Sequence, residues 1–132
     1  MEVRPKILFV CIGNSCRSQM AEGFARALSG GKLEVFSAGS RPSGKVSPDA
    51  ISTMKESGID ISKHHSKGLN HLPPERFDAI VTMGCGDACP QIPAPIRYDW
   101  KIPDPVGQPI ETFRQVREQI RGHVENLLKE VH

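Results

Sequence analysis

The segment that could carry chemistry combines thiols, hydroxyls and an arginine in the run Cys11-Ile12-Gly13-Asn14-Ser15-Cys16-Arg17-Ser18. An apolar stretch precedes it and an amphipathic stretch follows it, so we expect it to join a buried strand to the N-terminus of a helix. Backbone N–H groups there lack helical partners, and the helix dipole adds positive charge. Gly13 lets the backbone fold back, and Arg17 can clamp two oxygens through its planar fork. The run therefore predicts a site for a tetrahedral oxyanion.

Cys11 is the predicted nucleophile of this site. A thiol surrounded by N–H groups, an arginine and a helix N-terminus reacts as a thiolate, and the Ser18 hydroxyl is placed to donate to it. Such a thiolate is poised to attack the central atom of a bound oxyanion. The alternative is a cysteine that is merely buried, which is common. It does not account for the C-x5-R-S spacing at a strand–helix junction.

Strands and helices alternate along the chain. The predicted strands are 6–11, 33–38, 59–61, 78–83 and 96–100, and the predicted helices are 17–29, 48–57 and 110–131, with a short one within 64–77. This order indicates an α/β fold with a parallel sheet, right-handed crossovers and helices on both faces. Ligands of such sheets bind beyond the carboxyl ends of the strands, where Cys11 lies.

Length and charge favour one catalytic domain spanning residues 1–132. The 17 basic and 15 acidic side chains give a net charge of +2 without a basic patch, so we expect no nucleic-acid partner. The longest apolar run, Ile7–Ile12, is too short to span a bilayer, and no secretory leader is recognisable. We expect a cytoplasmic monomer.

Metal and cofactor sites are not expected. The spacings Cys11-x4-Cys16 and Cys85-x3-Cys89 differ from the C-x2-C pair of most zinc ribbons. The adjacent pair His64-His65 cannot point both side chains at one ion in a strand or helix, so we expect exposed loop histidines.

The C-x5-R-S motif directly after the first predicted strand resembles the low-molecular-weight phosphotyrosine phosphatases. The longer run from Gly13 to Gly23, together with Ser37-Ala38-Gly39, is similar to the arsenate reductases built on that fold. The resemblance extends from Lys6 to about Leu127. It implies a four-stranded parallel sheet with helices on both faces, which agrees with the strand and helix pattern.

Asp104, followed by Pro105, lies in the long segment before the last predicted helix. The resemblance implies that it faces the loop as the general acid, because the oxygen displaced by sulfur must be protonated as it leaves. From the sequence alone, Asp-Pro is equally a common turn dipeptide. Asp99 and Asp87 are rival candidates.

Val106 bears on the choice between phosphatase and reductase. In the phosphotyrosine phosphatases of this fold, aromatic residues follow the Asp-Pro pair and wall a slot for the phenyl ring. No tyrosine follows here, and Tyr98 is the only tyrosine of the chain. A slot without aromatic walls suits a bare anion, arsenate or phosphate, better than an aryl ester.

Cys85 and Cys89 supply what a reductase needs and a phosphatase does not. The resemblance implies that Cys11 attacks arsenate and that Cys85 then attacks Cys11, which releases arsenite and forms a disulfide. Cys89 next attacks Cys85, and thioredoxin reduces the resulting Cys85–Cys89 bridge. A bridge between residues four apart requires coiled backbone, and Gly84 and Gly86 are the expected hinge.

Several alternatives stay open. The C-x3-C spacing is shorter than is usual in thioredoxin-coupled reductases, so the order of attack and the reductant are undecided, and a small thiol such as glutathione or mycothiol could serve. A phosphatase acting on phosphotyrosine or small phosphate esters shares the loop and the acid. Cys85 and Cys89 could instead be simply buried. Cys16 either packs under the loop or protects Cys11 by a disulfide under oxidation. The last alternative is an anion-sensing module without turnover. It is disfavoured because a pure binding protein would not need a nucleophile.

Lys67 is expected to replace a cation. In some related reductases the positions of Asn14, Glu22 and Ser37 help to bind potassium, together with an aspartate after the third strand. Lys67 lies near the expected position of that aspartate. The hypothesis is that its ammonium group takes the place of the ion.

Overall fold

Four parallel strands form the centre of the fold in a computed structural model that describes residues 4–72, 76–84 and 94–131. They are β1 (Lys6–Cys11), β2 (Glu34–Gly39), β3 (Ala79–Thr82) and β4 (Ile96–Asp99), in the spatial order β2-β1-β3-β4. The registers pair Cys11 with Gly39 and Val10 with Thr82, so the carboxyl ends of the strands meet at one edge of the sheet. The predicted four-stranded parallel sheet is confirmed.

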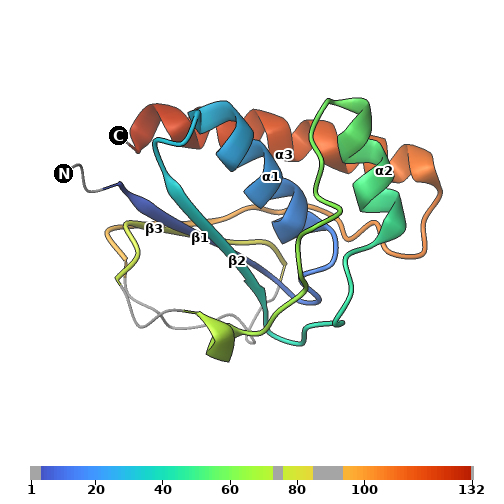
Figure 1. The fold of residues 1–132 in the computed structure, drawn as a ribbon, viewed down its shortest axis with the longest axis horizontal. Coiled ribbons are helices and arrows are strands. Elements are labelled where there is room, and N and C mark those ends of the chain that lie inside the picture. The colour runs from blue at the N-terminus through green and yellow to red at the C-terminus, as the bar shows by residue number, and fades with distance from the viewer. Residues whose placement is uncertain (1–3, 73–75, 85–93, 132) are drawn as a thin grey trace.

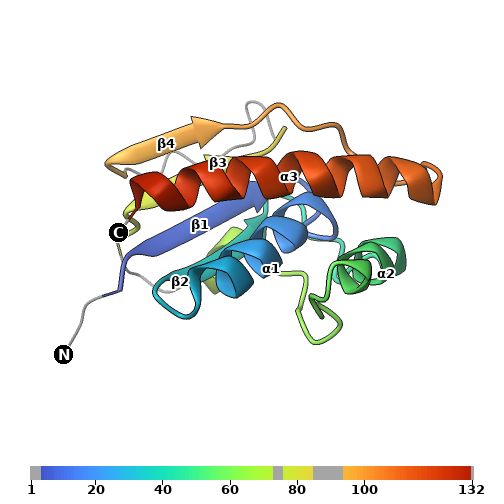
Figure 2. The same ribbon diagram turned by 90° about the horizontal axis from the view of Figure 1, so that it is seen from above.

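Three α-helices cover one face of this sheet: α1 (Arg17–Ser29), α2 (Pro48–Glu56) and α3 (Ile110–Glu130). Figure 1 shows them together above the strands, and Figure 2 shows α1 and α3 side by side across the sheet. Alternate residues of β1, namely Ile7, Phe9 and Cys11, belong to the large core cluster that these helices bury. Side chains of a strand alternate between faces, so the period-two pattern of β1 fixes which residues meet the helices.

The opposite face has a lighter cover. Leu8 and Val10 of β1 pack there with Phe77 and with partly buried residues around the single-turn 3₁₀ helix η1 (Leu69–His71). This turn lies below the strands in Figure 1. On this second face the described residues place only the 3₁₀ turn, whereas helices were predicted on both faces, and all the described α-helices lie on the first face.

The predicted strand at residues 59–61 is wrong. The Ile59 N–H donates to the Met54 carbonyl at 3.1 Å and closes the end of α2, and Asp60 Oδ1 accepts from the Ser62 N–H at 2.9 Å. The apolar residues at positions 59 and 61 alternate for a reason other than strand formation. Ile59 and Ile61 pack against α1 at Gly23, where an added Cβ would come within 3.3 Å and 2.9 Å of their side chains.

None of the described helices combines the length and the apolar character that crossing a membrane requires.

Candidate active site

The loop between β1 and α1 lies at the carboxyl edge of the sheet. Cys11 ends β1, Cys16 takes the N-cap position and Arg17 begins α1, whose first turn contains no acidic residue. The Met20 N–H donates to the Cys16 carbonyl at 2.8 Å and closes the first helical turn. The N–H groups that precede it in the turn have no helical acceptor, so the loop can offer them to an anion.

The segment after β2 holds this loop in place. Its backbone N–H groups donate to the loop carbonyls in four hydrogen bonds: Ser40 to Cys11 at 3.1 Å, Arg41 to Ile12 at 2.8 Å, Ser43 to Gly13 at 3.0 Å and Ser47 to Ser15 at 2.9 Å. Gly39 permits this close approach, since an added Cβ would lie 2.5 Å from the Ile12 carbonyl oxygen and 2.9 Å from the Asn14 nitrogen. These four loop carbonyls accept hydrogen bonds from residues outside the loop. The interior of the loop can therefore be lined by N–H donors.

Cys11 is 2% exposed, and among the described residues its sulfur has two hydrogen-bond partners. The Ser18 hydroxyl lies 2.9 Å from Sγ, and the Asn14 N–H donates to Sγ at 3.3 Å. The Asn14 amide also donates to Ser18 Oγ at 2.8 Å. A thiolate can only accept, so in the ionised state Ser18 donates to sulfur while it accepts from Asn14. The arrangement therefore offers the Cys11 sulfur two hydrogen-bond donors, the Ser18 hydroxyl and the Asn14 N–H.

Asn14 adopts a left-handed backbone conformation, with φ of 49°, and is fully buried. Its side-chain oxygen accepts from Gln19 Nε2 and from the Lys67 N–H, both at 2.9 Å. Gln19 Oε1 in turn lies 3.0 Å from His64 Nδ1. These bonds stabilise a conformation that non-glycine residues rarely adopt. Sequence reasoning missed the role of Gln19, although it directly follows the C-x5-R-S motif.

Arg17 and Asp104 are brought together beside Cys11. The guanidinium group donates from Nη1 to the Ile102 carbonyl at 3.1 Å, and Nη2 lies 3.6 Å from Asp104 Oδ2. Asp104 Oδ1 also accepts from the Val106 N–H at 3.1 Å, so the aspartate does form a turn as well as face the site. Of its rivals, Asp99 accepts from the Thr82 hydroxyl at the end of β3. Asp87 lies outside the described residues.

These side chains line a cavity of about 220 Å³. Its lining residues are Cys11, Ile12, Gly13, Ser15, Cys16, Arg17, Ser43, Asp104 and Val106. None of these described lining residues is aromatic, and the volume is below the roughly 300–1,000 Å³ of drug-sized ligand sites. A small inorganic anion suits this cavity better than an aryl ester.

Cys16 is a buried free thiol, as is Cys11. Burial raises the pKa of the Cys16 thiol, and hydrogen bonds with the hydroxyls of Ser15 and Ser47 offset this only in part. We infer that Cys16 stays protonated when Cys11 reacts. Cys85 and Cys89 lie outside the described residues.

Lys67 lies beside Ser37 and Glu22, where its ammonium group was predicted to take the place of a cation. Its Nζ donates to Ser37 Oγ at 3.2 Å and lies 3.7 Å from Glu22 Oε1, and the Ser37 hydroxyl donates to the same carboxylate. Glu22 is 3% exposed and also pairs with Arg26 at 2.8 Å. Burial lowers the pKa of Lys67, and the Glu22 carboxylate opposes that shift. The buried Glu22 carboxylate thus has two cationic partners from the same chain, Lys67 and Arg26.

The prediction that both adjacent histidines are exposed is wrong for His64. Its side chain is only 16% exposed, because it packs between Gln19 and Glu22. Burial lowers the pKa of His64. His65 is exposed, as expected. Among the described residues, no group of three or more His, Cys, Asp or Glu side chains could hold a metal ion.

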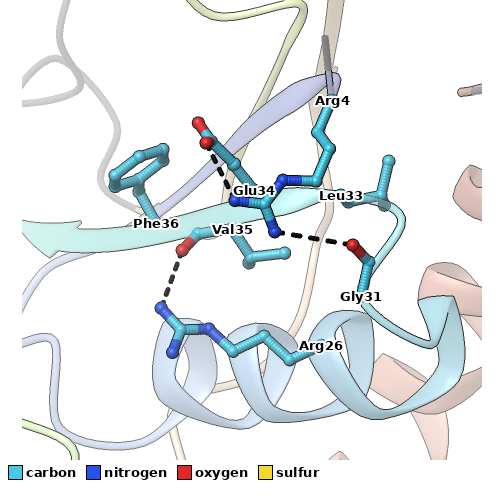
Figure 3. Close-up of a pocket in the computed structure, with 7 residues that line it drawn as sticks. All are labelled: Arg4, Arg26, Gly31, Leu33, Glu34, Val35 and Phe36. Atoms are coloured by element: carbon cyan, nitrogen blue, oxygen red, sulfur yellow. Dashed lines mark hydrogen bonds and ion pairs between the residues drawn. The ribbon is translucent and has the colours of Figure 1, made fainter. Parts of the chain in front are cut away.

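A larger cavity of about 610 Å³ lies away from Cys11, between α1 and β2. Figure 3 shows Arg4 and Arg26 approaching β2 from two sides. Arg4 donates to Glu34 at 3.0 Å, and Arg26 donates to the Val35 carbonyl at 2.9 Å. These polar groups bind one another, and no nucleophile lines the cavity, so its size does not make it the active site.

Comparison with protein families gives a match over residues 6–132 to the family described as Low molecular weight phosphotyrosine protein phosphatase. Among curated proteins, the chain is 44% identical over 129 residues to the glutaredoxin arsenate reductase of Synechocystis sp., covering 96% of this chain and 98% of the relative. It is 43% identical over 124 residues to an arsenate reductase of Staphylococcus aureus, covering 91% and 93%.

Solved structures give a corresponding result. An arsenate reductase in the phosphate binding state superposes with a TM-score of 0.88 at 43% identity, covering 97% of this chain and 99% of that one. The thioredoxin-dependent arsenate reductase of Corynebacterium glutamicum gives 0.79 at 32% identity, covering 96% and 61%. Vibrio vulnificus Wzb in complex with benzylphosphonate gives 0.81 at 27%, covering 98% and 100%.

Proposed function

Because the chain belongs to the low molecular weight phosphotyrosine protein phosphatase family, we propose that it works within that family as an arsenate reductase. The observation that carries this assignment is 44% identity over 96% of the chain to an arsenate reductase. The small cavity with Cys11, Arg17 and Asp104, and without an aromatic wall among its described lining residues, supports it.

The first step joins sulfur to arsenic. Arsenate binds to the N–H groups of the loop from Cys11 to Ser18 and to the Arg17 guanidinium. The Cys11 thiolate attacks arsenic, and Asp104 protonates the oxygen that leaves as water. The Ser18 hydroxyl, 2.9 Å from the sulfur, is placed to donate a hydrogen bond to the attacking thiolate. The product is a thiol–arsenate ester in which arsenic is still pentavalent.

The second step transfers two electrons. The Cys85 thiolate attacks Cys11 Sγ, the sulfur–arsenic bond breaks, and its electron pair leaves with arsenic as arsenite. Cys89 then attacks Cys85, which releases Cys11 and leaves a Cys85–Cys89 disulfide. These two roles remain proposals that rest on the positions of the cysteines in the sequence.

Thioredoxin is the proposed reductant of that disulfide. The thioredoxin-dependent relative from Corynebacterium glutamicum, which is 32% identical, supports this choice. The relative from Synechocystis is named a glutaredoxin arsenate reductase and is 44% identical, so coupling to glutathione and glutaredoxin is the second candidate. In that case the thiol of glutathione would perform part of the thiol relay that is assigned here to Cys85 and Cys89.

An assay of arsenate-dependent NADPH oxidation tests the assignment. Turnover is expected with thioredoxin and thioredoxin reductase, and it should disappear in Cys11→Ser, Cys85→Ser and Cys89→Ser. Phosphate in place of arsenate is the control and should give no oxidation. Turnover only with glutathione, glutaredoxin and glutathione reductase would replace the proposed reductant. Absence of turnover with both systems would reject the reductase.

Phosphatase activity is the alternative function. The loop, Arg17 and Asp104 also suit phosphate esters, and a fold relative was solved with benzylphosphonate bound. Val106, which is 56% exposed, stands at the cavity where an aromatic wall would be needed. We therefore expect weak hydrolysis of aryl phosphates, and efficient hydrolysis without arsenate reduction would favour a phosphatase.

A further inference from the structure

Gly84 lies against the guanidinium group of Arg17, which is the proposed clamp for the oxyanion. It follows Met83, whose N–H extends the pairing of β3 with β1 by donating to the Val10 carbonyl at 2.7 Å. The φ angle of Gly84 is +79°, and an added Cβ would lie 2.5 Å from Arg17 Nη1, 3.6 Å from Cζ and 3.9 Å from Nη2. The guanidinium group therefore packs against the part of Gly84 where any other residue carries its side chain.

Contacts on its opposite side hold the same guanidinium group in place. Nη1 donates to the Ile102 carbonyl at 3.1 Å, and Nη2 lies 3.6 Å from Asp104. Arg17 is only 4% exposed and lines the cavity beside Cys11. One planar group is thus fixed between the end of β3 and the segment that carries Asp104.

We propose that Gly84 is a positioning residue for oxyanion binding, because its missing side chain lets Arg17 present its fork to the cavity. The inference rests on the proposed function, in which Arg17 clamps the anion. Non-bonded atoms need roughly 3.5 Å, so a Cβ at 2.5 Å would displace Nη1 by about 1 Å. A misplacement of about 1 Å at a reacting group can reduce a rate by about 100-fold.

The test compares Gly84→Ala with Gly58→Ala. Gly58 has φ of +78° and nothing within 4 Å of its added Cβ, so it shares the backbone strain without the contact. The readout is the ratio of Cys11 alkylation rates with iodoacetate and iodoacetamide, followed by mass spectrometry of the Cys11 peptide. Iodoacetate carries a carboxylate that the clamp should attract, whereas iodoacetamide is neutral.

The expected result is that Gly84→Ala lowers the preference for iodoacetate by about tenfold or more, while Gly58→Ala retains the wild-type ratio. An unchanged ratio in Gly84→Ala would overturn the proposal, and so would an equal loss in both variants. This readout does not involve arsenate reduction, so a failed reductase assay leaves it intact and its own failure leaves the reductase intact.

A thermodynamic cycle with Arg17→Ala covers the case in which Gly84→Ala folds but is destabilised. Removing the guanidinium group removes the contact, so Gly84→Ala should lower Tm less in the Arg17→Ala background than in the wild type. The remaining decrease should match that of Gly58→Ala, which reports backbone strain alone. Equal decreases in the two backgrounds would contradict a role through Arg17.

Discussion

The surroundings of the Cys11 sulfur involve few atoms. Within the described part of the chain, the sulfur has two partners, the Ser18 hydroxyl at 2.9 Å and the Asn14 N–H at 3.3 Å. Both belong to the segment from Cys11 to Ser18, and the Asn14 side chain is itself held by hydrogen bonds from Gln19 and Lys67. The proposed nucleophile and the proposed anion site are therefore formed by the same backbone turn.

Ser18→Ala should slow the reaction of Cys11 with iodoacetamide at neutral pH by about tenfold or more. The reason is the loss of a hydrogen bond to a charged acceptor, which contributes about 1.5–3 kcal/mol. Alkylation of the Cys11 peptide measures the rate. Ser15→Ala is the control, since its hydroxyl contacts Cys16 and not Cys11. An unchanged rate in Ser18→Ala would show that the hydroxyl does not support the thiolate.

Lys67 leads to a prediction about potassium. Its ammonium group contacts Ser37 and approaches Glu22, so a potassium ion should have no place beside that carboxylate. The Tm of the wild type should be equal in potassium and sodium salts of the same ionic strength. Lys67→Gln should lower stability by about 1 kcal/mol or more, whereas the nearby exposed Lys63→Gln should not. A potassium-specific rise in wild-type Tm or activity would contradict the hypothesis.

Among elements, the segment between α2 and η1 illustrates the limit of sequence patterns. The strands and the three helices follow from apolar spacing, because burial on a sheet or under a helix has a fixed period. Ile59 and Ile61 alternate like a strand, yet they pack on α1 at Gly23, a contact that no local pattern encodes. The prediction that His64 is exposed is wrong for the same reason, because the burial of its side chain depends on contacts with Gln19 and Glu22 of α1.

His64 gives this segment a pH-dependent effect on stability. Burial, Arg26 and Lys67 lower its pKa, while Glu22 and Asp60 oppose them. In the unfolded chain histidine binds a proton near pH 6.5, whereas the folded protein does so only at lower pH. The unfolded state therefore binds more protons as pH falls below 6.5, and stability decreases in that window.

The measurement is urea unfolding of the wild type and His64→Gln above and below this window. The wild type should lose stability relative to His64→Gln as pH falls, because the variant lacks the buried imidazole. His65→Gln, which changes an exposed residue, should behave as the wild type does. A constant difference between the wild type and His64→Gln across pH would contradict the assigned shift.

For the whole molecule, the sheet and the α-helices share one large core cluster, which predicts a single cooperative unit. Trp100, the only tryptophan, belongs to this cluster and stacks on His123 of α3 with 4.9 Å between ring centroids. Its fluorescence and the far-UV circular dichroism should therefore change in one coincident unfolding transition. Two separate transitions would contradict a single domain. We also predict a monomer in size-exclusion chromatography.

The sequence predicted the loop and its place in the fold because Cys11, Arg17 and Ser18 lie close together at a strand–helix junction, and the role of Cys11 as nucleophile stays a prediction. Asp104 needed the family resemblance, since a turn dipeptide carries no information about what it faces. The contact of Gly84 with Arg17 depends on where the chain passes the Arg17 side chain after β3, and only the three-dimensional structure shows it. Cys85 and Cys89 stay predictions.

The most direct test of the reductase is the mass of the fully reduced protein after one equivalent of arsenate, with disulfide mapping. The proposed relay predicts a loss of about two mass units and a Cys85–Cys89 bridge. A Cys11–Cys85 bridge would keep the reductase but remove Cys89 from the relay. Unchanged mass with all four thiols free would contradict the thiol relay and favour a phosphatase or a reductase that depends on a small thiol.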